Sequence, residues 1–316
     1  MATPVPQISV IVPARDAAGT IEATLAALAA QDVDRPYEVI VVDDGSSDDT
    51  VEIARGAAGV KVVTQQGAGP GPARNRGAAD AAGEVLAFTD ADCVPAPDWL
   101  RAALAAIGEA DVVQGAVRPV RDVRPMPFDR TISVDGRGGL YETANLIVRR
   151  DAFERLGGFE DWLGPVLGKP LAEDVWFGWR ARRAGMRVAF APDAVVEHAV
   201  FRRGLGEFLR DRARVTYFPA IVKRIPELRR ELLVGRLFLN ARTAAFDLAL
   251  LGAVLALLLG SLVPLVAVLP YAFMLVRGAV RWRGRAPIAA FGELLADAAG
   301  AASLVAGSIR YRAPVL

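Results

Sequence analysis

The sequence is poor in the two side chains that most often bind zinc or form disulfides. Among 316 residues there is one cysteine, Cys93, and one histidine, His198. A single cysteine excludes an intrachain disulfide and a cysteine-rich zinc site. The formal net charge is only +1 at pH 7, so the chain lacks the overall basic field with which nucleic-acid-binding domains attract phosphates. We therefore expect no nucleic acid partner.

The N-terminal segment also lacks the pattern of a secretory signal, because its first apolar run is short and ends at Pro13. We expect no cleaved signal. Long apolar runs are instead found near the other end, where residues 248–276 contain no charged side chain. A bilayer-spanning helix needs about 20 apolar residues. The C-terminal part is therefore a candidate membrane segment.

From residue 8 to about residue 117, β-branched runs alternate with helical patterns. This alternation predicts an α/β fold with a mostly parallel central sheet flanked by helices. The predicted strands are 8–12, 37–42, 60–64, 85–89, 143–149, 187–191 and 194–199. The predicted helices are 20–31, 48–55, 75–82 and 173–184. A Pro- and Gly-containing loop is expected over 118–139, and the whole domain is expected to cover residues 1–200.

Polar clusters follow three of these strands. They are Pro13-Ala14-Arg15-Asp16, Asp43-Asp44 and Asp90-Ala91-Asp92. Ligands of open parallel sheets bind at the carboxyl ends of the strands. Carboxylates can lie beside a phosphate-bearing ligand only when a divalent cation lies between them, so Asp92 is the first candidate metal ligand. By itself, an Asp-x-Asp sequence is more typical of a turn.

The ordered set of motifs resembles glycosyltransferase family 2. The matching segments are 10–15, 41–48, 71–77, 88–92, 145–150, 157–159 and 173–174. The resemblance covers roughly the first 200 residues. It implies a GT-A nucleotide-diphospho-sugar transferase domain and a hexosyltransferase type of activity.

The resemblance also implies roles for individual residues. Those expected at the nucleotide-sugar are Pro13, Ala14, Arg15, Asp43, Asp44, Arg74, Asp90 and Ala91. A guanidinium binds phosphate or carboxylate oxygens through two parallel hydrogen bonds, which suits Arg74 to this position. Within the set, Asp44 is expected to recognise the base or ribose, with Asp90 on the ribose side.

The metal and the catalytic base are expected from four further residues. Asp92 and His198 are the candidate ligands of Mn²⁺ or Mg²⁺, although a lone histidine is more often structural. Asp174 is the candidate base, which would take the proton of the acceptor hydroxyl, and Glu173 is its alternative. Acidic residues are also common in the first turn of a helix for electrostatic reasons alone.

One segment departs from the processive members of the resembled family. Those polysaccharide synthases carry a Gln-x-x-Arg-Trp motif after the base, and residues 177–183 do not match it. This departure predicts transfer of a single sugar and not polymer synthesis.

Residues 201–243 interleave arginines and lysines with aromatic and aliphatic side chains, which suits interfacial helices at an anionic membrane surface. The alternative is a solvated helix face. Residues 244–316 are expected to be membrane helices, with 248–276 forming either one kinked span or a hairpin. Residues 288–309 are a weaker candidate, because Glu293 and Asp297 would be costly in lipid. A buried helical subdomain is the alternative for this region.

Together these patterns predict an inverting, metal-dependent glycosyltransferase at the cell membrane, with its catalytic domain on the cytoplasmic side. A UDP-sugar is the favoured donor and a GDP-sugar the second choice. The expected acceptor is a lipid-linked group or a glycan, and membrane lipids are expected partners. The alternatives are an inert membrane-associated scaffold that keeps the fold, or a nucleotidyltransferase.

Overall fold

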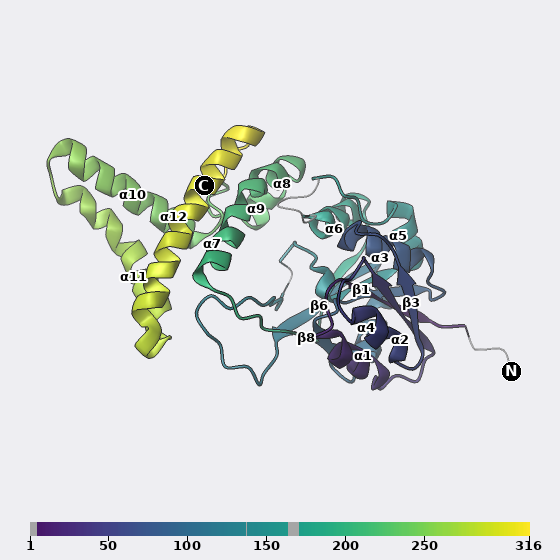
Figure 1. Ribbon diagram of the computed structural model, residues 1–316. Coiled ribbons are helices and arrows are strands. Elements are labelled where there is room, and N and C mark those ends of the chain that lie inside the picture. The colour runs from purple at the N-terminus through teal and green to yellow at the C-terminus, as the bar shows by residue number, and fades with distance from the viewer. Residues whose placement is uncertain (1–4, 137, 164–170) are drawn as a thin grey trace. The chain divides into compact units, whose positions relative to one another are not determined.

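The computed structural model describes residues 5–136, 138–163 and 171–316. The chain forms two compact units (Figure 1). The first comprises the described residues up to Val123 together with those of Thr131–Val200, and we call it the sheet unit. The second comprises Arg124–Arg130 and Phe201–Leu316, and we call it the helical unit.

The sheet unit is built on eight strands in the order β3-β2-β1-β4-β7-β6-β8-β5. The strands are β1 (Ile8–Ala14), β2 (Tyr37–Asp43), β3 (Val60–Thr64), β4 (Val85–Phe88), β5 (Cys93–Pro95), β6 (Val112–Pro119), β7 (Leu146–Arg149) and β8 (Val188–His198). Strands β1 to β4 pair in parallel, as do β6 and β8. Strand β7 is antiparallel to β4 and β6, and β5 is antiparallel to β8. The sheet is therefore mixed. Its first four strands, β1 to β4, form the parallel part that the sequence predicts.

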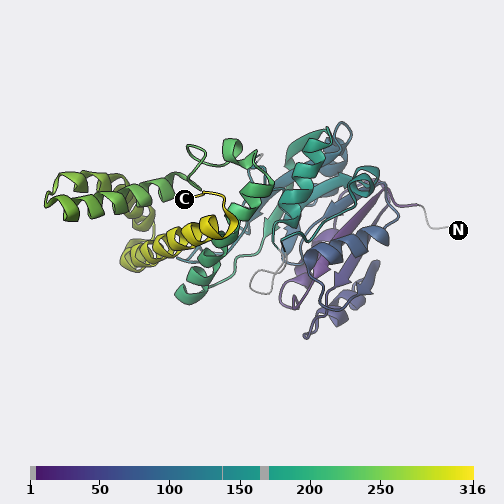
Figure 2. The same cartoon turned by 90° about the horizontal axis from the view of Figure 1, so that it is seen from above.

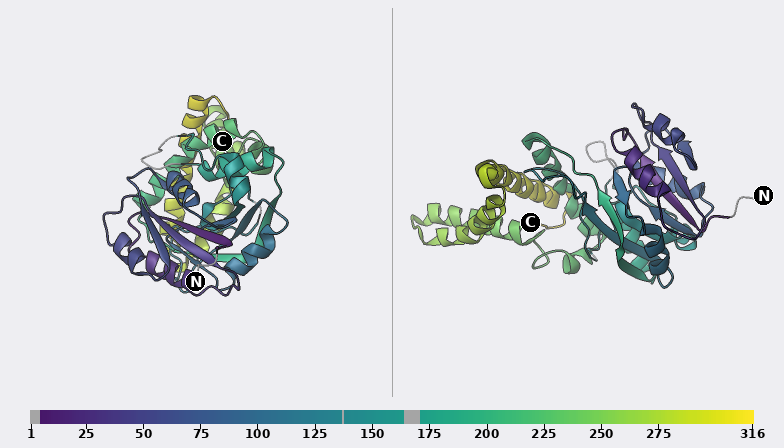
Figure 3. Two further views of the ribbon diagram at one scale, coloured as in Figure 1. Left: turned by 90° about the vertical axis from the view of Figure 1, so that its right-hand side faces the viewer. Right: turned by 90° about the horizontal axis from the view of Figure 1, so that it is seen from below.

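Helices cover both faces of this sheet (Figure 3). They are α1 (Ile21–Ala29), α2 (Thr50–Gly56), α3 (Pro70–Ala79), α4 (Trp99–Ile107), α5 (Arg150–Leu156) and α6 (Glu173–Arg183), with a 3-10 turn η1 at Thr143–Asn145. Because side chains alternate along a strand, Val10 faces the core under α1 whereas Ile11 faces α3. A Cβ at Gly77 would lie 2.5 Å from Ile11 Cγ2, so glycine permits α3 to pack this closely.

Three predicted boundaries were wrong. Helix α3 begins at Pro70, not near residue 75, because Gly69 adopts φ +100° and the proline occupies the first turn, where no backbone N–H is needed. Residues 143–145 form a 3-10 turn before β7. The two strands predicted over 187–199 are one strand, β8, whose register against β6 shifts between Gly115 and Ala116.

The helical unit begins with short helices and ends with long apolar ones. The elements are α7 (Leu205–Ala213), η2 (Arg214–Tyr217), α8 (Phe218–Arg224), α9 (Leu228–Glu231), α10 (Ala241–Leu259), η3 (Val263–Val268), α11 (Leu269–Val280), η4 (Arg283–Arg285) and α12 (Ala286–Tyr311). Three helical segments, 241–259, 263–280 and 283–311, are long and apolar enough to cross a membrane. The 248–276 stretch is a hairpin that turns at Gly260, with φ +60° (Figure 2).

The acidic residues of α12, expected to be costly in lipid, have partners within the helical unit. Arg242 Nε donates to Asp297 Oδ2 at 2.7 Å, and its Nη2 lies 3.2 Å from Glu293 Oε2. The Tyr271 hydroxyl also donates to Asp297, at 2.8 Å. Since paired charges are tolerated in apolar surroundings far better than isolated ones, α12 is a stronger candidate span than its sequence alone indicated.

Small residues bring the helices of this unit together. A Cβ at Gly252 of α10 would lie 2.6 Å from the Pro264 carbonyl oxygen of η3. A Cβ at Gly307 of α12 would lie 2.0 Å from the Thr216 carbonyl oxygen of η2. Close backbone approach at glycine is typical of helices that associate in membranes. The short basic helices and the apolar helices therefore form one packed unit.

Candidate active site

The centre of the candidate site is the guanidinium of Arg74, carried by α3. Its Nη2 donates to Asp90 Oδ1 at 2.7 Å, and its Nη1 lies 3.4 Å from Glu173 Oε1. Arg74 is only 5% exposed. Burial would by itself lower the pKa of this guanidinium, but the charges of Asp90 and Glu173 outweigh burial and raise that pKa. Helices α3 and α6 and the end of β4 therefore meet at one permanently charged group.

The carboxyl group of Asp174 lies beside this cluster. Burial, followed by the charge of Glu173, raises the pKa of Asp174 to about 8. Two effects oppose this increase: the N–H of Val175, which donates to Asp174 Oδ1 at 2.7 Å, and the charge of Arg74. A carboxyl group that titrates near neutral pH can take up a proton during a reaction, which is the property of a general base.

Asp92 and His198 form a second cluster where β5 and β8 pair. The His198 Nδ1 lies 2.7 Å from the Ala199 carbonyl oxygen, a distance that indicates an N–H donor. In that tautomer the lone pair is on Nε2, which lies 3.6 Å from Asp92 Oδ1. A backbone carbonyl commonly fixes the orientation of a metal-binding histidine in this way. The two side chains therefore fit a divalent cation.

The acidic residues after β2 shape the loops around them. Asp44 accepts hydrogen bonds from Gln65 Nε2 at 2.7 Å and from the N–H groups of Ala68 and Gly69 at 2.7 and 2.8 Å. Arg15 Nη1 lies 3.9 Å from Asp44 Oδ2 and its side chain is about half exposed. Asp44 thus fixes the loop that leads into α3, and Arg15 is accessible at the same edge of the sheet.

The other residues predicted at the nucleotide hold the ends of β1, β2 and β4 through local hydrogen bonds and strand pairing. Asp43 accepts from the N–H of Gly45 at 3.2 Å and so closes the turn after β2. The Ala14 carbonyl accepts from the Asp44 N–H at 2.8 Å, and the Ala91 carbonyl accepts from Thr24 Oγ1 at 3.1 Å. Pro13 pairs with Val42 in the parallel register of β1 and β2.

The predicted site residues thus form connected groups. Arg74, Asp90 and Glu173 are joined directly, and Asp174 follows Glu173 in α6. Asp90 and Asp92 belong to one turn, in which the Cys93 N–H donates to the Asp90 carbonyl at 3.1 Å. The arginine cluster and the Asp92–His198 pair are therefore connected through this turn.

Sequence reasoning missed Glu142 as a member of the site. Its charge contributes to the raised pKa of Asp174, and burial raises its own pKa. The preceding residue, Tyr141, has φ +57°. Its ring packs so closely on Gly178 of α6 that a Cβ at Gly178 would lie 2.0 Å from Tyr141 Cγ. The signal in the sequence is weak, since only Gly178 beside two tryptophans marks this packing.

The sequence analysis also gave no role to Cys93 beyond excluding a disulfide. Its Sγ lies 3.8 Å from Asp92 Oδ1 and belongs to a group of three potential ligand atoms with His198. The sequence signal that could have indicated a ligand role for Cys93 is its position directly after the Asp-x-Asp motif.

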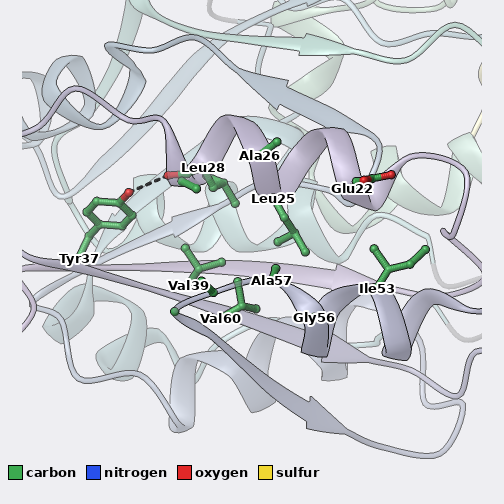
Figure 4. A pocket seen from close by; sticks show the side chains of 13 residues that line it. Glu22, Leu25, Ala26, Leu28, Tyr37, Val39, Ile53, Gly56, Ala57 and Val60 are labelled. Atoms are coloured by element: carbon green, nitrogen blue, oxygen red, sulfur yellow. Dashed lines mark hydrogen bonds between the residues drawn. The ribbon is translucent and has the colours of Figure 1, made fainter.

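A separate groove of about 690 Å³ lies between α1 and α2 (Figure 4). Leu25, Ile53 and Val60 are among its lining residues, and Tyr37 stands at the first position of β2. None of the candidate site residues named above lines this groove. Because its lining is largely aliphatic and lies toward the amino ends of β2 and β3, it does not belong to the candidate active site.

Two family descriptions match the chain. Glycosyl transferase family 2 matches residues 9–155, and Glycosyl transferase family group 2 matches residues 137–280. Among curated proteins, the chain is 32% identical over 231 residues to Glycosyltransferase AglE of Haloferax volcanii, which covers 68% of this chain and 73% of that protein. It is 30% identical over 221 residues to Probable glycosyltransferase YdaM of Bacillus subtilis, covering 60% of this chain and 50% of that protein.

Solved structures show the same fold. The mannosyltransferase PcManGT from Pyrobaculum calidifontis, in complex with GDP-Man and Mn²⁺, is similar with a TM-score of 0.63 and 24% identity, over 98% of this chain and 88% of that chain. S. aureus TarS 1-349 in complex with UDP-GlcNAc is similar with a TM-score of 0.50 and 21% identity, over 97% and 92% of the two chains. The mixed sheet with flanking helices is thus a GT-A fold. With these matches to its motifs and its fold, the chain belongs to glycosyltransferase family 2 and is a glycosyltransferase.

Proposed function

We propose that this glycosyltransferase moves a single sugar from a nucleotide-diphospho-sugar to a lipid-linked acceptor at the cytoplasmic face of a membrane. A UDP-sugar is the favoured donor and a GDP-sugar the second choice. The observation that carries the proposal is the buried Arg74 cluster with Asp174 beside it, connected by one turn to the Asp92–His198 pair. Phosphate recognition, proton transfer and cation binding are the three functions that such a transfer needs.

In the proposed mechanism, Asp174 takes the proton of the acceptor hydroxyl while that oxygen attacks the anomeric carbon. Attack from the side opposite the diphosphate inverts the configuration at that carbon. Glu173 is less suited to be the base, because its carboxylate already lies 3.4 Å from the Arg74 guanidinium. A phosphate acceptor is ionised before it reacts, so dependence on Asp174 also distinguishes a hydroxyl acceptor from a phosphate acceptor.

Asp92 and His198 would hold Mn²⁺ or Mg²⁺, which when bound supplies positive charge to the departing diphosphate. The 3.6 Å separation of their ligand atoms and the fixed tautomer of His198 support this assignment. The solved structure of PcManGT is a complex with GDP-Man and Mn²⁺, which fits the same class of donor and cation.

The remaining nucleotide contacts are proposed from position. Arg15 and Asp44 lie at the ends of β1 and β2, and Asp90 follows β4, so all three are at the carboxyl edge of the parallel strands. Pro13, Ala14, Asp43 and Ala91 complete this edge. We propose that Asp44 holds the loop against which the base and ribose bind.

The helical unit supports a membrane-bound acceptor. On α10, the side chains of Leu257 and Leu258 are exposed by 85% and 74%, as expected for a surface covered by lipid. Arg210 and Arg230 are exposed on the short basic helices that precede it. Such cations are attracted to anionic lipid headgroups. A polyprenyl-linked or glycolipid acceptor would be presented at such a surface.

The structure of α6 supports transfer of one sugar rather than polymer synthesis. After Asp174, the helix continues with Phe177 and Trp179, both buried, and with Gly178 packed against Tyr141. Trp179 Nε1 donates to the Gly139 carbonyl at 3.0 Å. These side chains are used for packing, where a processive synthase has its Gln-x-x-Arg-Trp motif.

The direct test is a thermal-shift and calorimetric screen of nucleotide-sugars with the full chain in detergent and Mn²⁺. We expect one nucleotide class to raise the melting temperature only when the cation is present. Asp92→Ala should abolish that increase, whereas Asp98→Ala, an exposed aspartate at the start of α4, should preserve it. Equal stabilisation of wild type and Asp92→Ala would contradict the proposed cation site.

The acceptor class is tested with the full chain in proteoliposomes. Radiolabelled sugar should pass to polyprenyl phosphate or glycolipid in anionic vesicles much faster than to water-soluble sugars. Arg210→Gln combined with Arg230→Gln should reduce transfer in anionic vesicles and leave transfer in neutral vesicles unchanged. Faster transfer to a water-soluble acceptor would show that the acceptor is not lipid-linked.

A further inference from the structure

A third potential ligand, the thiol of Cys93, lies at the cation site proposed above. The Sγ of Cys93, a carboxylate oxygen of Asp92 and a ring nitrogen of His198 lie within 4.8 Å of one another. Cys93 and His198 are direct partners in the antiparallel register of β5 and β8. Side chains of directly paired residues project to the same side of a sheet. The strand pairing itself therefore brings the thiol to the histidine.

Two of the three separations between these atoms match those expected around a metal ion. Metal–ligand bonds of about 2.0–2.3 Å at angles of roughly 110–120° place oxygen and nitrogen about 3.4–3.6 Å apart, and sulfur and oxygen about 3.6–3.8 Å apart. The corresponding distances here are 3.6 Å between Asp92 Oδ1 and His198 Nε2, and 3.8 Å between Asp92 Oδ1 and Cys93 Sγ. The third separation, between Cys93 Sγ and a ring nitrogen of His198, is below 4.8 Å, so small side-chain shifts would let one ion contact all three.

We propose that Cys93 is a third protein ligand of this cation, so that the site binds its ion through one carboxylate, one imidazole and one thiolate. This inference rests on the proposed function, because it completes the cation site of the transferase. Thiolate is a soft ligand that favours Zn²⁺ and Co²⁺ over Mg²⁺. The site is therefore expected to hold Zn²⁺ and Co²⁺ much more tightly than Mg²⁺, with Mn²⁺ between them.

The burial of Cys93 fits either a ligand or a small core side chain. The residue has no exposed surface and packs in the main core of the sheet unit. Buried cysteine often acts only as a small hydrophobe. The sulfur of Cys93, unlike that of a purely hydrophobic cysteine, lies near a carboxylate and an imidazole as well as apolar atoms. A spectroscopic test separates the two roles.

Co²⁺ is the probe, because thiolate coordination gives a sulfur-to-cobalt charge-transfer band in the near ultraviolet. The chain has a single cysteine, so any such band must come from Cys93. We expect the full chain in detergent, titrated with Co²⁺ in the presence of UDP, to develop this band. Cys93→Ser and Cys93→Ala should lose the band while calorimetry still shows Co²⁺ binding, with affinity for Zn²⁺ reduced about tenfold or more and affinity for Mg²⁺ nearly unchanged.

Two outcomes would overturn the inference and they have different meanings. Co²⁺ binding by wild type without the band would show that Cys93 is not a ligand and would leave the proposed transferase intact. Absence of Co²⁺ and Mn²⁺ binding by wild type, with and without UDP, would remove the cation site and with it the proposed mechanism. The melting temperatures of Cys93→Ser and Cys93→Ala show whether either variant is folded, and one folded variant suffices for the comparison.

Discussion

Each unit of this glycosyltransferase contains a largely buried arginine held between two carboxylates. In the sheet unit, Arg74 lies between Asp90 and Glu173. In the helical unit, Arg242 lies between Asp297 and Glu293. The two clusters use the same chemical groups at similar distances. They differ in the group that accompanies them.

Beside Arg74 stands a third carboxyl group, Asp174, whose pKa is raised by burial and by a neighbouring charge. Beside Arg242 stands Tyr271, whose hydroxyl donates a hydrogen bond to Asp297. The Arg74 cluster therefore retains an acid that can exchange a proton, whereas in the Arg242 cluster both carboxylates are paired with a donor. The difference teaches that a buried ion pair marks a functional site when an additional titratable group accompanies it, and a structural contact when every acid is matched by a donor.

The largest expected effect comes from removing the additional group. Asp174→Asn should lower kcat about 10²–10⁴-fold, because proton transfer by a positioned side chain contributes about that much. The same change should stabilise the fold near pH 8. A raised pKa means that the folded protein loses stability as pH rises from the ordinary value of 3.8 through about 8, and asparagine has no proton to lose. Turnover assays and melting curves at pH 6 and pH 8 measure both effects.

Asp151→Asn is the matched control, because Asp151 is an exposed aspartate in the first turn of α5. It should leave both turnover and melting temperature nearly unchanged. If Asp174→Asn kept its turnover with a hydroxyl acceptor, Asp174 would not be the base.

The next effect is on the structural cluster. Arg242→Met should destabilise the helical unit by about 3 kcal/mol or more, since it leaves the buried carboxylate of Asp297 without its cation. Adding Asp297→Asn and Glu293→Gln should restore much of the lost stability by removing the stranded charges. Thermal unfolding in detergent is the measurement, and Arg281→Met, an exposed arginine after α11, is the control. Equal stability of the single and triple variants would show that the cluster is not a structural contact.

A smaller effect is expected from Arg74→Lys, which keeps the charge but loses the planar arrangement of donors. Lysine cannot bridge Asp90 and Glu173 as a guanidinium does. We expect kcat/KM to fall about 10- to 100-fold, because a misplacement of about 1 Å in an active site can cost about 100-fold. Steady-state kinetics check this value, with the exposed Arg76→Lys on the same helix as the control. Unchanged kinetics would indicate that the arginine has no role beyond its charge.

Much of the first half of the sheet unit could be predicted from sequence, because its central strands are apolar throughout. Strand β3 was predicted with its exact bounds, and β1, β2 and β4 within two residues of their ends. The start of α3 was missed because Gly71 and Pro72 are usually read as turn residues, although proline is well accommodated in a first helical turn. Local composition thus predicted these four strands better than the start of α3, and it predicted no counterpart of α4, β5, β6 or α5.

Contacts between distant segments could not be predicted from local patterns. The pairing of Cys93 with His198 depends on β5, a strand of three residues that lies 101 to 105 positions from its partners on β8. Likewise, the contact of Arg242 with Asp297 joins residues 55 positions apart. The sequence predicts a charge cost for Asp297 in lipid, but the compensation of that charge by Arg242 depends on which helices pack together.

The smallest effect should come from Glu142, whose negative charge helps to raise the pKa of Asp174. The acid limb of kcat/KM should reflect Asp174, so activity should fall about tenfold for each pH unit below about 8. Glu142→Gln removes one like charge, which lowers the pKa of Asp174 and moves this limb to lower pH by a fraction of a unit. Activity at pH 7 should therefore rise slightly, whereas the exposed Glu109→Gln should leave the profile unchanged. A shift to higher pH would mean that Glu142 acts on Asp174 by a hydrogen bond to its ionised form and not by its charge.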